Sequence, residues 1–542
     1  MRRSASDKPA SRPVLLTIGD DELSEPFATW TDGTYTVLRA GGSIMAIPPT
    51  NAQAIRLHVW VGKDLDDLAP TAPVGELETG VHKHRGHVFD ADWWICGLWV
   101  DGLGKWYGFM HAEDHFCVDS GISDWGKDLR TICMWTSPDQ GATWEYVRPV
   151  VTISDRYPMP PASQSSWPKN GGAGDHKLVV SPQRDFLYLL YTNFTYTKPE
   201  RDDEDNAHGN LAIARCRLSP KGVPDRWWKF FDGDFTEPGV GGDETWLMSP
   251  EMGDPDNSQR TVTWSRHLER WVMIFSPRGA GAHIAFSDDL VRWDPSYELL
   301  PPSEHGYNYF NLIDYGPLGT DESVGQIAWL YYTRSDYEVH RRLVRFDLIE
   351  DKGDEGEGNQ VLFDSSLVRS DERFVGGEQY DSVLGFGRRQ GEFGWLYMAV
   401  SPLRSKPGAL GFWSPIDFEE SMDAWSSRGS RSAIGRDWQQ AVPGVESARV
   451  WRASKTGAVT VTFEAQCETS GVGASALSVF HNRTKIWPHD ESRYFVSPAN
   501  PRVTATDELL VKRGDRIFFV LMSPQEPVAR LQWRIRVTAS GD

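Results

Sequence analysis

The carboxylates best suited to chemistry stand just before strand-like segments that recur along the chain. Asp92 occurs in HVFDADWW, Asp175 in GGAGDHKLVV and Glu251 in WLMSPEM. Glycoside hydrolysis needs two carboxyl groups, one protonated as the acid and one ionised as base or nucleophile. Carboxyl groups that lie close together acquire different pKa values, because neighbouring like charges cannot all ionise. Asp92, Asp175 and Glu251 are therefore candidates for a catalytic set, and the resemblance described below implies a role for each.

Three more carboxylates hold comparable positions and are alternative members of the set: Glu25, Asp90 and Glu244. Each of the six also has a structural interpretation, since a carboxylate beside a strand can cap it or form a turn. The choice between Glu244 and Glu251 stays open at this point.

Aromatic and polar residues near the same segments are candidates for binding substrate. Trp and Tyr rings offer flat faces to a sugar, and an Arg can bind a hydroxyl or a carboxylate. The substrate-binding candidates are Trp93, Arg278, Tyr309, Tyr380, Asp381 and His176. In HAEDH, strand alternation places His111, Glu113 and His115 on one face, but the HExxH spacing of a helical zinc site is absent. We assign no metal ligands and predict no cofactor, leaving open a divalent ion such as calcium in a channel.

The segments that position these residues form a repeat. Six short aromatic strands occur between residues 26 and 428, most of them preceded by a strand and a tight turn and followed by a third strand. They are TYTVLRA, KWYGFMH, FLYLLYTN, RWVMIFSP, AWLYYTRS and WLYMAVSP. Repeats of three or four strands are typical of β-propellers. We expect an all-β protein with a five- or six-bladed β-propeller, six units being counted, and functional groups at the channel mouth.

Two of the third strands end in similar turns, SPDQGATW from Ser137 to Trp144 and SDDLVRW from Ser287 to Trp293. Ser and Asp side chains in such turns accept backbone N–H groups, and the Trp can then fold back between sheets. A looser copy, SPIDFEESMDAW, ends the sixth unit. These turns indicate the fold, but they do not identify catalytic residues.

The strand pattern changes near residue 431, after a loop rich in Arg and Ser. The last part of the chain contains alternating strands without the repeated turn, which indicates a β-sandwich. We therefore divide the chain into an N-terminal segment (1–25), a propeller (26–428) and a C-terminal sandwich (429–542).

These motifs resemble known families. SPDQGATW is similar to the Asp box of sialidase-like propellers, and the order Asp, Asp, Glu on successive units resembles the five-bladed arabinanase, xylosidase and invertase type of glycoside hydrolase. That resemblance implies Asp92 as base or nucleophile, Asp175 as the tuning carboxylate and Glu251 as general acid. The F/Y-R-I-P stretch that opens true sialidases is absent. The stretches from Asn482 to Trp487 and from Lys512 to Phe518 resemble jelly-roll modules appended to carbohydrate-active enzymes.

The net charge of the chain argues against two kinds of partner. With 76 acidic and 56 basic residues, the net charge is −20, which argues against nucleic acid and anionic membrane surfaces as partners. No apolar window approaches a membrane span and no leader is recognised, so we expect a cytoplasmic protein, or a secreted one if the start is misassigned. Its oligomeric state stays open.

The expected function is an exo-acting glycoside hydrolase with a carbohydrate substrate. One alternative is a polysaccharide lyase in which a His or Tyr, such as His176 or Tyr309, abstracts a proton. The other is a non-catalytic glycan-binding propeller.

Overall fold

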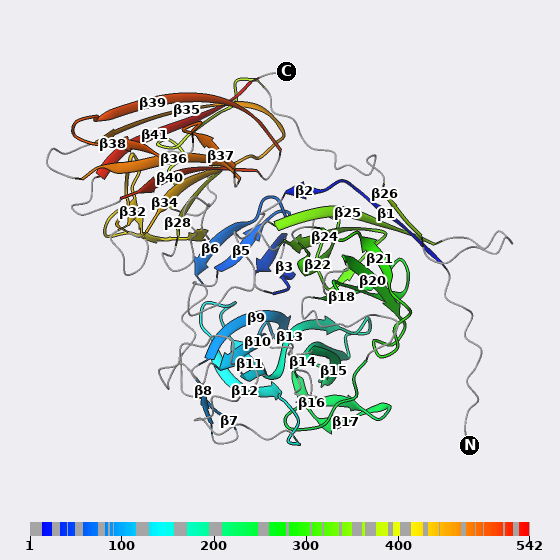
Figure 1. Ribbon diagram of the computed structural model, residues 1–542. Helices are drawn as coiled ribbons and strands as arrows, with labels where there is room; N and C mark the ends of the chain where they lie inside the picture. Colours follow the sequence, from blue (N-terminus) through cyan, green and yellow to red (C-terminus); the bar gives the residue numbers. More distant parts are fainter. Residues whose placement is uncertain are drawn as a thin grey trace, which may run out of the picture.

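The computed structural model of the chain is built from strands and their connections (Figure 1). It describes residues 13–23, 33–40, 42–48, 58–73, 82–84, 87–89, 91–114, 129–156, 171–194, 209–247, 260–277, 281–303, 306–316, 319–334, 339–348, 360–363, 376–388, 394–400, 413–426, 432–443, 445–467, 473–482, 484–490, 493–512, 515–523 and 530–540. These residues contain no α-helix, and so none that could cross a membrane. The cysteines among them, Cys96, Cys133, Cys216 and Cys467, are buried.

The strands between residues 13 and 348 form five mainly antiparallel groups, called here sheets one to five. Sheets two and three are joined into one nine-stranded sheet by a short parallel pairing of Leu129 and Arg130 with Gly171 and Gly172. Sheet one contains β3 (Thr36–Ala40), β4 (Ser43–Ile47), β5 (His58–Gly62) and β6 (Ala69–Pro73). Sheet two contains β9 (Ala91–Val100), β10 (Trp106–Asp114), β11 (Leu129–Ser137) and β12 (Glu145–Val151). Sheet three contains β13 (Gly171–Val180), β14 (Phe186–Phe194), β15 (Gly209–Leu218), β16 (Pro224–Phe231) and β17 (Asp234–Pro238).

Sheet four contains β18 (Thr261–Ser265), β19 (Arg270–Phe275), β20 (Ala282–Ser287) and β21 (Tyr297–Leu300). Sheet five contains β22 (Asn308–Asp314), β24 (Ile327–Thr333) and β25 (Val339–Leu348), and its fourth strand is β1 (Val14–Ile18). The short strands are β2 (Glu22–Leu23), β7 (His82–His84), β8 (His87–Phe89), β23 (Ser323–Val324) and β26 (Gln360–Phe363).

The start of the chain completes the last of the five sheets. β1 runs antiparallel to β25, with Val14 opposite Leu348 and Ile18 opposite Val344. β1 lies within residues 1–25, which we expected to form a separate N-terminal segment, but it pairs with a strand of the expected propeller. The pairing satisfies backbone groups of β25 that would otherwise form an open sheet edge.

The five sheets pack face to face in a closed cycle. Separate apolar cores join sheets one and two, two and three, three and four, and four and five. A fifth core joins sheet five back to sheet one, where the rings of Tyr35 and Tyr331 meet edge to face at 6.3 Å. Because each sheet is covered on both faces, its inner strands are apolar on both faces, as in β9, where every residue from Trp93 to Trp99 is buried.

In two turns between strands, Ser and Asp side chains accept hydrogen bonds from backbone N–H groups. In the first, Gly141 N–H donates to Ser137 Oγ (2.8 Å) and Thr143 N–H to Asp139 Oδ1 (2.8 Å). The Trp144 indole donates to Gly141 O and is buried between sheets one and two. The second turn repeats this pattern with Ser287, Asp289 and Trp293. Each turn therefore directs a Trp into the core between neighbouring sheets.

The sixth predicted unit does not join this cycle. Its aromatic strand, β28 (Trp395–Val400), pairs with β34 (Ser447–Arg452) and β29 (Trp413–Pro415), and β27 (Gln379–Asp381) pairs with β41 (Arg530–Ala539). Of the two blade counts that we expected, these pairings favour five, and the boundary at 428/429 stays a prediction. The aromatic pattern marks a buried strand, but it does not specify the partner strand.

Residues 376–540, called here the C-terminal module, form two sheets packed face to face. One has the order β30 (Asp417–Glu419), β31 (Ala424–Ser426), β32 (Ala433–Ile434), β33 (Trp438–Gln440), β41, β35 (Gly457–Cys467) and β39 (Arg502–Val511). The other contains β29, β28, β34, β40 (Arg516–Met522), β36 (Ser475–His481), β37 (Thr484–Trp487) and β38 (Tyr494–Val496). Their shared core includes Phe519 and Trp533, whose rings meet at 6.3 Å and 88°.

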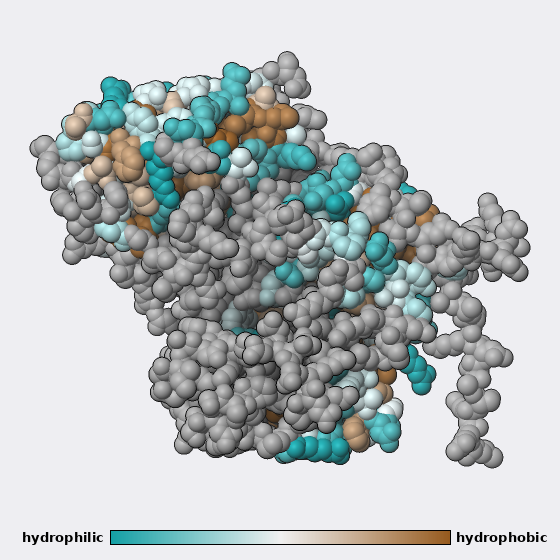
Figure 2. All heavy atoms as spheres, viewed as in Figure 1, coloured by the Kyte–Doolittle hydropathy of each residue, from teal (hydrophilic) through white to brown (hydrophobic). Residues whose placement is uncertain are grey.

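The C-terminal module contacts sheet one (Figure 1). Ala69 packs against the outer face of the module's second sheet, and the Arg452 guanidinium donates to Leu68 O. The module's surface mixes polar and apolar residues (Figure 2), and its exposed apolar side chains include Leu384 and Leu510.

Candidate functional site

The first strand of each sheet lines the centre of the cycle. Consecutive first strands, β3 to β9, β9 to β13, β13 to β18 and β18 to β22, contact one another. We call the end where these strands begin the N-terminal mouth and the end where they finish the C-terminal mouth. Asp92 and Asp175 lie near the starts of β9 and β13, so the sequence-predicted carboxylates belong to the N-terminal mouth.

Four charged or titratable residues at this mouth form a closed ring of contacts, called here the four-residue ring. Asp175 Oδ2 accepts from Arg130 Nη1 (3.0 Å), and Arg130 Nη2 lies 3.0 Å from Glu113 Oε1. Glu113 Oε1 in turn lies 3.0 Å from His111 Nε2, and His111 Nδ1 accepts the Asp175 N–H (2.7 Å). The ring joins sheets two and three and fixes the Asp175 carboxylate.

Glycines let the chain approach closely enough to make the ring. β13 begins GGAG, and a Cβ on Gly172 would lie 2.1 Å from Arg130 O, while one on Gly174 would lie 2.5 Å from His111 Cε1. Asp175 itself has φ +43°, at a register shift in the pairing of β13 with β14. Such an irregularity re-aims a side chain near the end of a strand.

The ring is open to solvent at Asp175 and closed at His111, whose side chains are 22% and 4% exposed. Burial alone would lower the pKa of His111, but the carboxylates of Asp175 and Glu113 outweigh it, so the pKa of His111 is raised. In the neutral imidazole, Nδ1 accepts from Asp175 N–H, so Nε2 carries the proton and donates to Glu113.

The backbone of Asp92 is next to the four-residue ring. In the pairing of β9 with β10, Asp92 is opposite Glu113, so its backbone is next to the strand that carries Glu113 and His111. The Asp92 side chain is outside the described part of the structure. Also outside it are four other sequence-predicted residues: Glu25, Asp90, Glu251 and Arg278.

Two predicted substrate-binding residues are buried instead. Trp93 is 2% exposed in the core between sheets one and two, where its ring meets Trp135 at 5.2 Å. His176 is equally buried, its Nε2 lies 3.1 Å from Phe109 O, and burial lowers its pKa to about 3. Neither side chain can touch a sugar in the mouth, because strand alternation turns each away from it. The same burial removes His176 as the base of the lyase alternative.

Glu244 is also structural. Its side chain is buried, and its Oε2 lies 2.5 Å from the ammonium of the equally buried Lys229. Lys229 additionally donates to Thr152 O and Gly242 O. Burial raises the pKa of Glu244, while Lys229 opposes that rise. The carboxylate is thus held inside an ion pair and is not a site residue.

The three remaining predicted binding residues lie in two different parts of the molecule. Tyr309 lies at the start of β22, at the N-terminal mouth, with φ +51° and its carbonyl oxygen accepting from Asn311 Nδ2. Tyr380 and Asp381 lie on β27 of the C-terminal module, paired with β41. The prediction that these two residues belong to the same mouth is therefore wrong, because the sixth unit is not part of the cycle.

Two arginines at the N-terminal mouth were not among the predicted residues. Arg130 belongs to the four-residue ring, and Arg260, just before β18, is buried and donates to Thr192 Oγ1 (2.8 Å). Burial lowers the pKa of Arg260 to about 10, against the effect of Asp175. Arg260 immediately precedes a first strand, which is the signal that could have identified it. In the described residues, no group of three or more His, Cys, Asp or Glu side chains could hold a metal.

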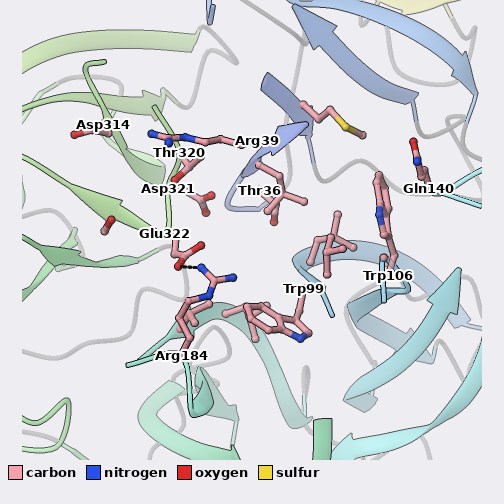
Figure 3. Close-up of a pocket in the computed structure, with 18 of the residues that line it drawn as sticks. Thr36, Arg39, Trp99, Trp106, Gln140, Arg184, Asp314, Thr320, Asp321 and Glu322 are labelled. Atoms are coloured by element: carbon pink, nitrogen blue, oxygen red, sulfur yellow. Dashed lines mark hydrogen bonds and ion pairs between the residues drawn. The ribbon is translucent and has the colours of Figure 1, made fainter. Parts of the chain in front are cut away.

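The C-terminal mouth contains a cavity of about 980 Å³ (Figure 3). Its wall carries Arg184 paired with Glu322 (Figure 3). Arg266 also lines it, with Nη2 3.0 Å from Asp314 Oδ1. Asp321 also lines this cavity and is bound to the buried Lys177 of β13. Each of the three carboxylates named here is paired with a cation.

No protein-family model and no curated protein matches the sequence. Among solved structures, the chain resembles an exo-β-1,3-galactanase from Phanerochaete chrysosporium (10% identity, TM-score 0.36, 95% of this chain and 100% of that chain). It also resembles a family 43 arabinoxylan arabinofuranohydrolase from Bacillus subtilis (10% identity, TM-score 0.36, 95% of this chain and 97% of that chain). A third similar structure is a sialidase (11% identity, TM-score 0.37, 98% of this chain and 54% of that chain). The solved structures that resemble this chain thus include glycoside hydrolases and a sialidase.

Proposed function

We propose that the chain is an exo-acting glycoside hydrolase built on a five-bladed propeller, with its site at the N-terminal mouth. The observation that carries the proposal is the Asp175 carboxylate, held 3.0 Å from Arg130 at the start of a central strand. A second carboxylate, Glu113, shares the same arginine, and Asp92 is opposite Glu113 in the sheet. Several carboxylates around one opening are what glycoside hydrolysis requires.

In this proposal Asp92 is the base or nucleophile, Asp175 tunes the site and Glu251 is the general acid. Arg130 and the Asp175 backbone keep the tuning carboxylate in one orientation. A fixed negative charge near a second carboxyl group favours the protonated form of that group. Asp175 would therefore help the acid to keep its proton near neutral pH, which is the condition for protonating a leaving oxygen.

The centre of the propeller is closed behind this mouth. Lys177 of β13 binds Asp321, which follows β22, and donates to Tyr35 O on sheet one. This buried ion pair connects three of the five sheets across the centre, between the two mouths. A glycan can therefore reach the site only from the N-terminal mouth, and product analysis tests whether it is cleaved from its end.

The test is hydrolysis of a panel of aryl glycosides and oligosaccharides by the full chain. We expect release of single sugars or short products from one chain end, and a loss of kcat of at least about 100-fold in Glu251→Gln and Asp92→Asn. Glu322→Gln, a carboxylate at the C-terminal mouth, is the matched control and should keep its activity. Unchanged hydrolysis in both site variants would overturn the assignment of the site.

A further inference from the structure

His111 is the buried member of the four-residue ring, and no step of the proposed reaction uses it. It lies on β10, where it is 3% exposed, and its two ring nitrogens contact different neighbours. Nδ1 accepts the Asp175 N–H (2.7 Å), and Nε2 lies 3.0 Å from Glu113 Oε1. Nδ1 also lies 3.6 Å from Asp175 Oδ1. The same nitrogen is therefore close to both the backbone N–H and the carboxylate of Asp175.

The imidazole of His111 is held tightly by the strands on either side of it. The Trp94 ring of β9 meets it edge to face at 5.4 Å. From β13, the Gly174 backbone comes so near that an added Cβ would lie 2.6 Å from Nδ1. A change of protonation at His111 must therefore be accommodated by its partners, because the imidazole has little room to turn.

The charged and titratable groups around His111 come from three strands. Burial opposes the protonated imidazole, Asp175 of β13 and Glu113 of β10 favour it, and Arg130 of β11 opposes it, so that the pKa of His111 is raised. His176 of β13 adds no charge near neutral pH, because burial lowers its pKa to about 3. His111 therefore gains its proton at a higher pH than an ordinary histidine does.

A proton on Nδ1 is incompatible with the contact that Nδ1 makes. One nitrogen of a neutral imidazole accepts a hydrogen bond, whereas both nitrogens donate once the ring is protonated. Two donors, Nδ1–H and the Asp175 N–H, would then face each other, and their hydrogen bond is lost. The acceptor beside Nδ1 is then Asp175 Oδ1, which must come closer than its 3.6 Å to form a hydrogen bond.

The backbone at Asp175 is able to make this movement. In the described pairing of β13 with β14, the register passes from Gly174 opposite Thr192 to Lys177 opposite Leu190, and Asp175 lies in the irregular step between them. Its φ of +43° is unfavourable for a residue with a Cβ. A rotation at Asp175 therefore breaks no pair of the ladder and can relieve strain.

We infer that His111 is a positioning residue whose neutral imidazole holds Asp175 in its working orientation, and whose protonation draws the Asp175 carboxylate toward the imidazole and slows hydrolysis. The inference rests on the function proposed above and gives the same site a pH dependence. A displaced Asp175 no longer tunes the acid, so activity is present above the pKa of His111 and is lost as the pH falls through it.

Two substitutions separate the roles of the two ring nitrogens. In His111→Asn, the amide oxygen can occupy the position of Nδ1 and accept the Asp175 N–H, but it cannot be protonated. In His111→Gln, the amide nitrogen can occupy the position of Nε2 and keep the Glu113 contact, while the acceptor for Asp175 is lost. At alkaline pH we expect His111→Asn to keep kcat within about threefold and His111→Gln to lose about tenfold, the effect of one hydrogen bond.

The test is the pH profile of kcat for the full chain and its variants. Below the pKa of His111, kcat of the unmodified chain should fall about tenfold per pH unit. His111→Asn should lack this decrease and retain only the one caused by protonation of the catalytic base at lower pH. His481→Asn is the matched control, because His481 of the C-terminal module also pairs with a carboxylate, Asp515 (2.8 Å), and this variant should keep the unmodified profile. Thermal unfolding verifies that each variant is folded.

Two kinetic results would overturn the inference: an unchanged acidic decrease in a folded His111→Asn protein, or equal losses of kcat in His111→Asn and His111→Gln. A second readout needs no activity. In nitrogen-15 NMR of the full chain, the Asp175 amide signal should shift with the protonation of His111, and a constant signal would also overturn the inference. Absence of hydrolysis would remove the proposed function and still leave this readout, whereas hydrolysis with an unchanged profile would remove only the role of His111.

Discussion

The ammonium of Lys177 lies 2.5 Å from Asp321 Oδ2, with both side chains almost entirely buried. Asp321 also accepts the Val37 N–H on its other oxygen (2.8 Å), so both partners are held by sheet one as well as by each other. The pair ties sheets one, three and five together at the centre, where the first strands meet. Its two charges compensate each other where both side chains are almost entirely buried.

Removing one charge should therefore destabilise the protein strongly. We expect Lys177→Met to lower the free energy of unfolding by about 3–5 kcal/mol, because Asp321 would be left as an uncompensated buried charge. The exposed pair of Arg184 and Glu322 is the control, and Arg184→Gln should cost less than about 1 kcal/mol. Guanidinium denaturation measures both, and equal losses would contradict a buried, structural role for Lys177.

Two glycines with positive φ should respond differently to the same change. Gly104 (φ +83°) has no atom within 4 Å of an added Cβ, so Gly104→Ala should cost only the backbone strain, about 1–2 kcal/mol. Gly172 (φ +105°) adds a 2.1 Å clash with Arg130 O, and Gly172→Ala should cost at least twice as much. It should also reduce hydrolysis, because the clash displaces Arg130 from Asp175. Equal unfolding free energies for the two variants would show that β13 can move away without penalty.

The buried His176 should make stability depend on pH below neutrality. Its pKa is about 3 in the folded protein and about 6.5 when unfolded, so between these values the unfolded chain binds the extra proton. Stability from this group is therefore present above pH 6.5 and is lost as the pH falls, by up to about 1.4 kcal/mol per pH unit. His176→Gln removes this dependence. Between pH 6.5 and 5, its unfolding free energy should fall about 1.6 kcal/mol less than that of the unmodified chain. Parallel pH profiles for the two proteins would rule out a neutral buried His176.

Much of the local structure follows from the sequence. Alternating and continuous apolar runs predicted the aromatic strands, and the Ser–Asp–Trp turns form hydrogen bonds that their side chains alone dictate. The position of Asp175 at the start of a central strand also follows, since GGAGDHKLVV reads as a glycine-rich approach to a buried strand. These features depend on residues close together in the chain.

The sequence by itself determined an all-β chain with strands, turns and a set of carboxylates near strand starts. Only the tertiary structure decided which strands pair: β1 joined β25 at the end of the cycle, and β28 joined the C-terminal module. It also decided that Trp93 packs in a core and that Arg130 holds Asp175. The physical reason is that an apolar period fixes which face of a strand is buried, whereas its partner depends on contacts between residues distant in the chain.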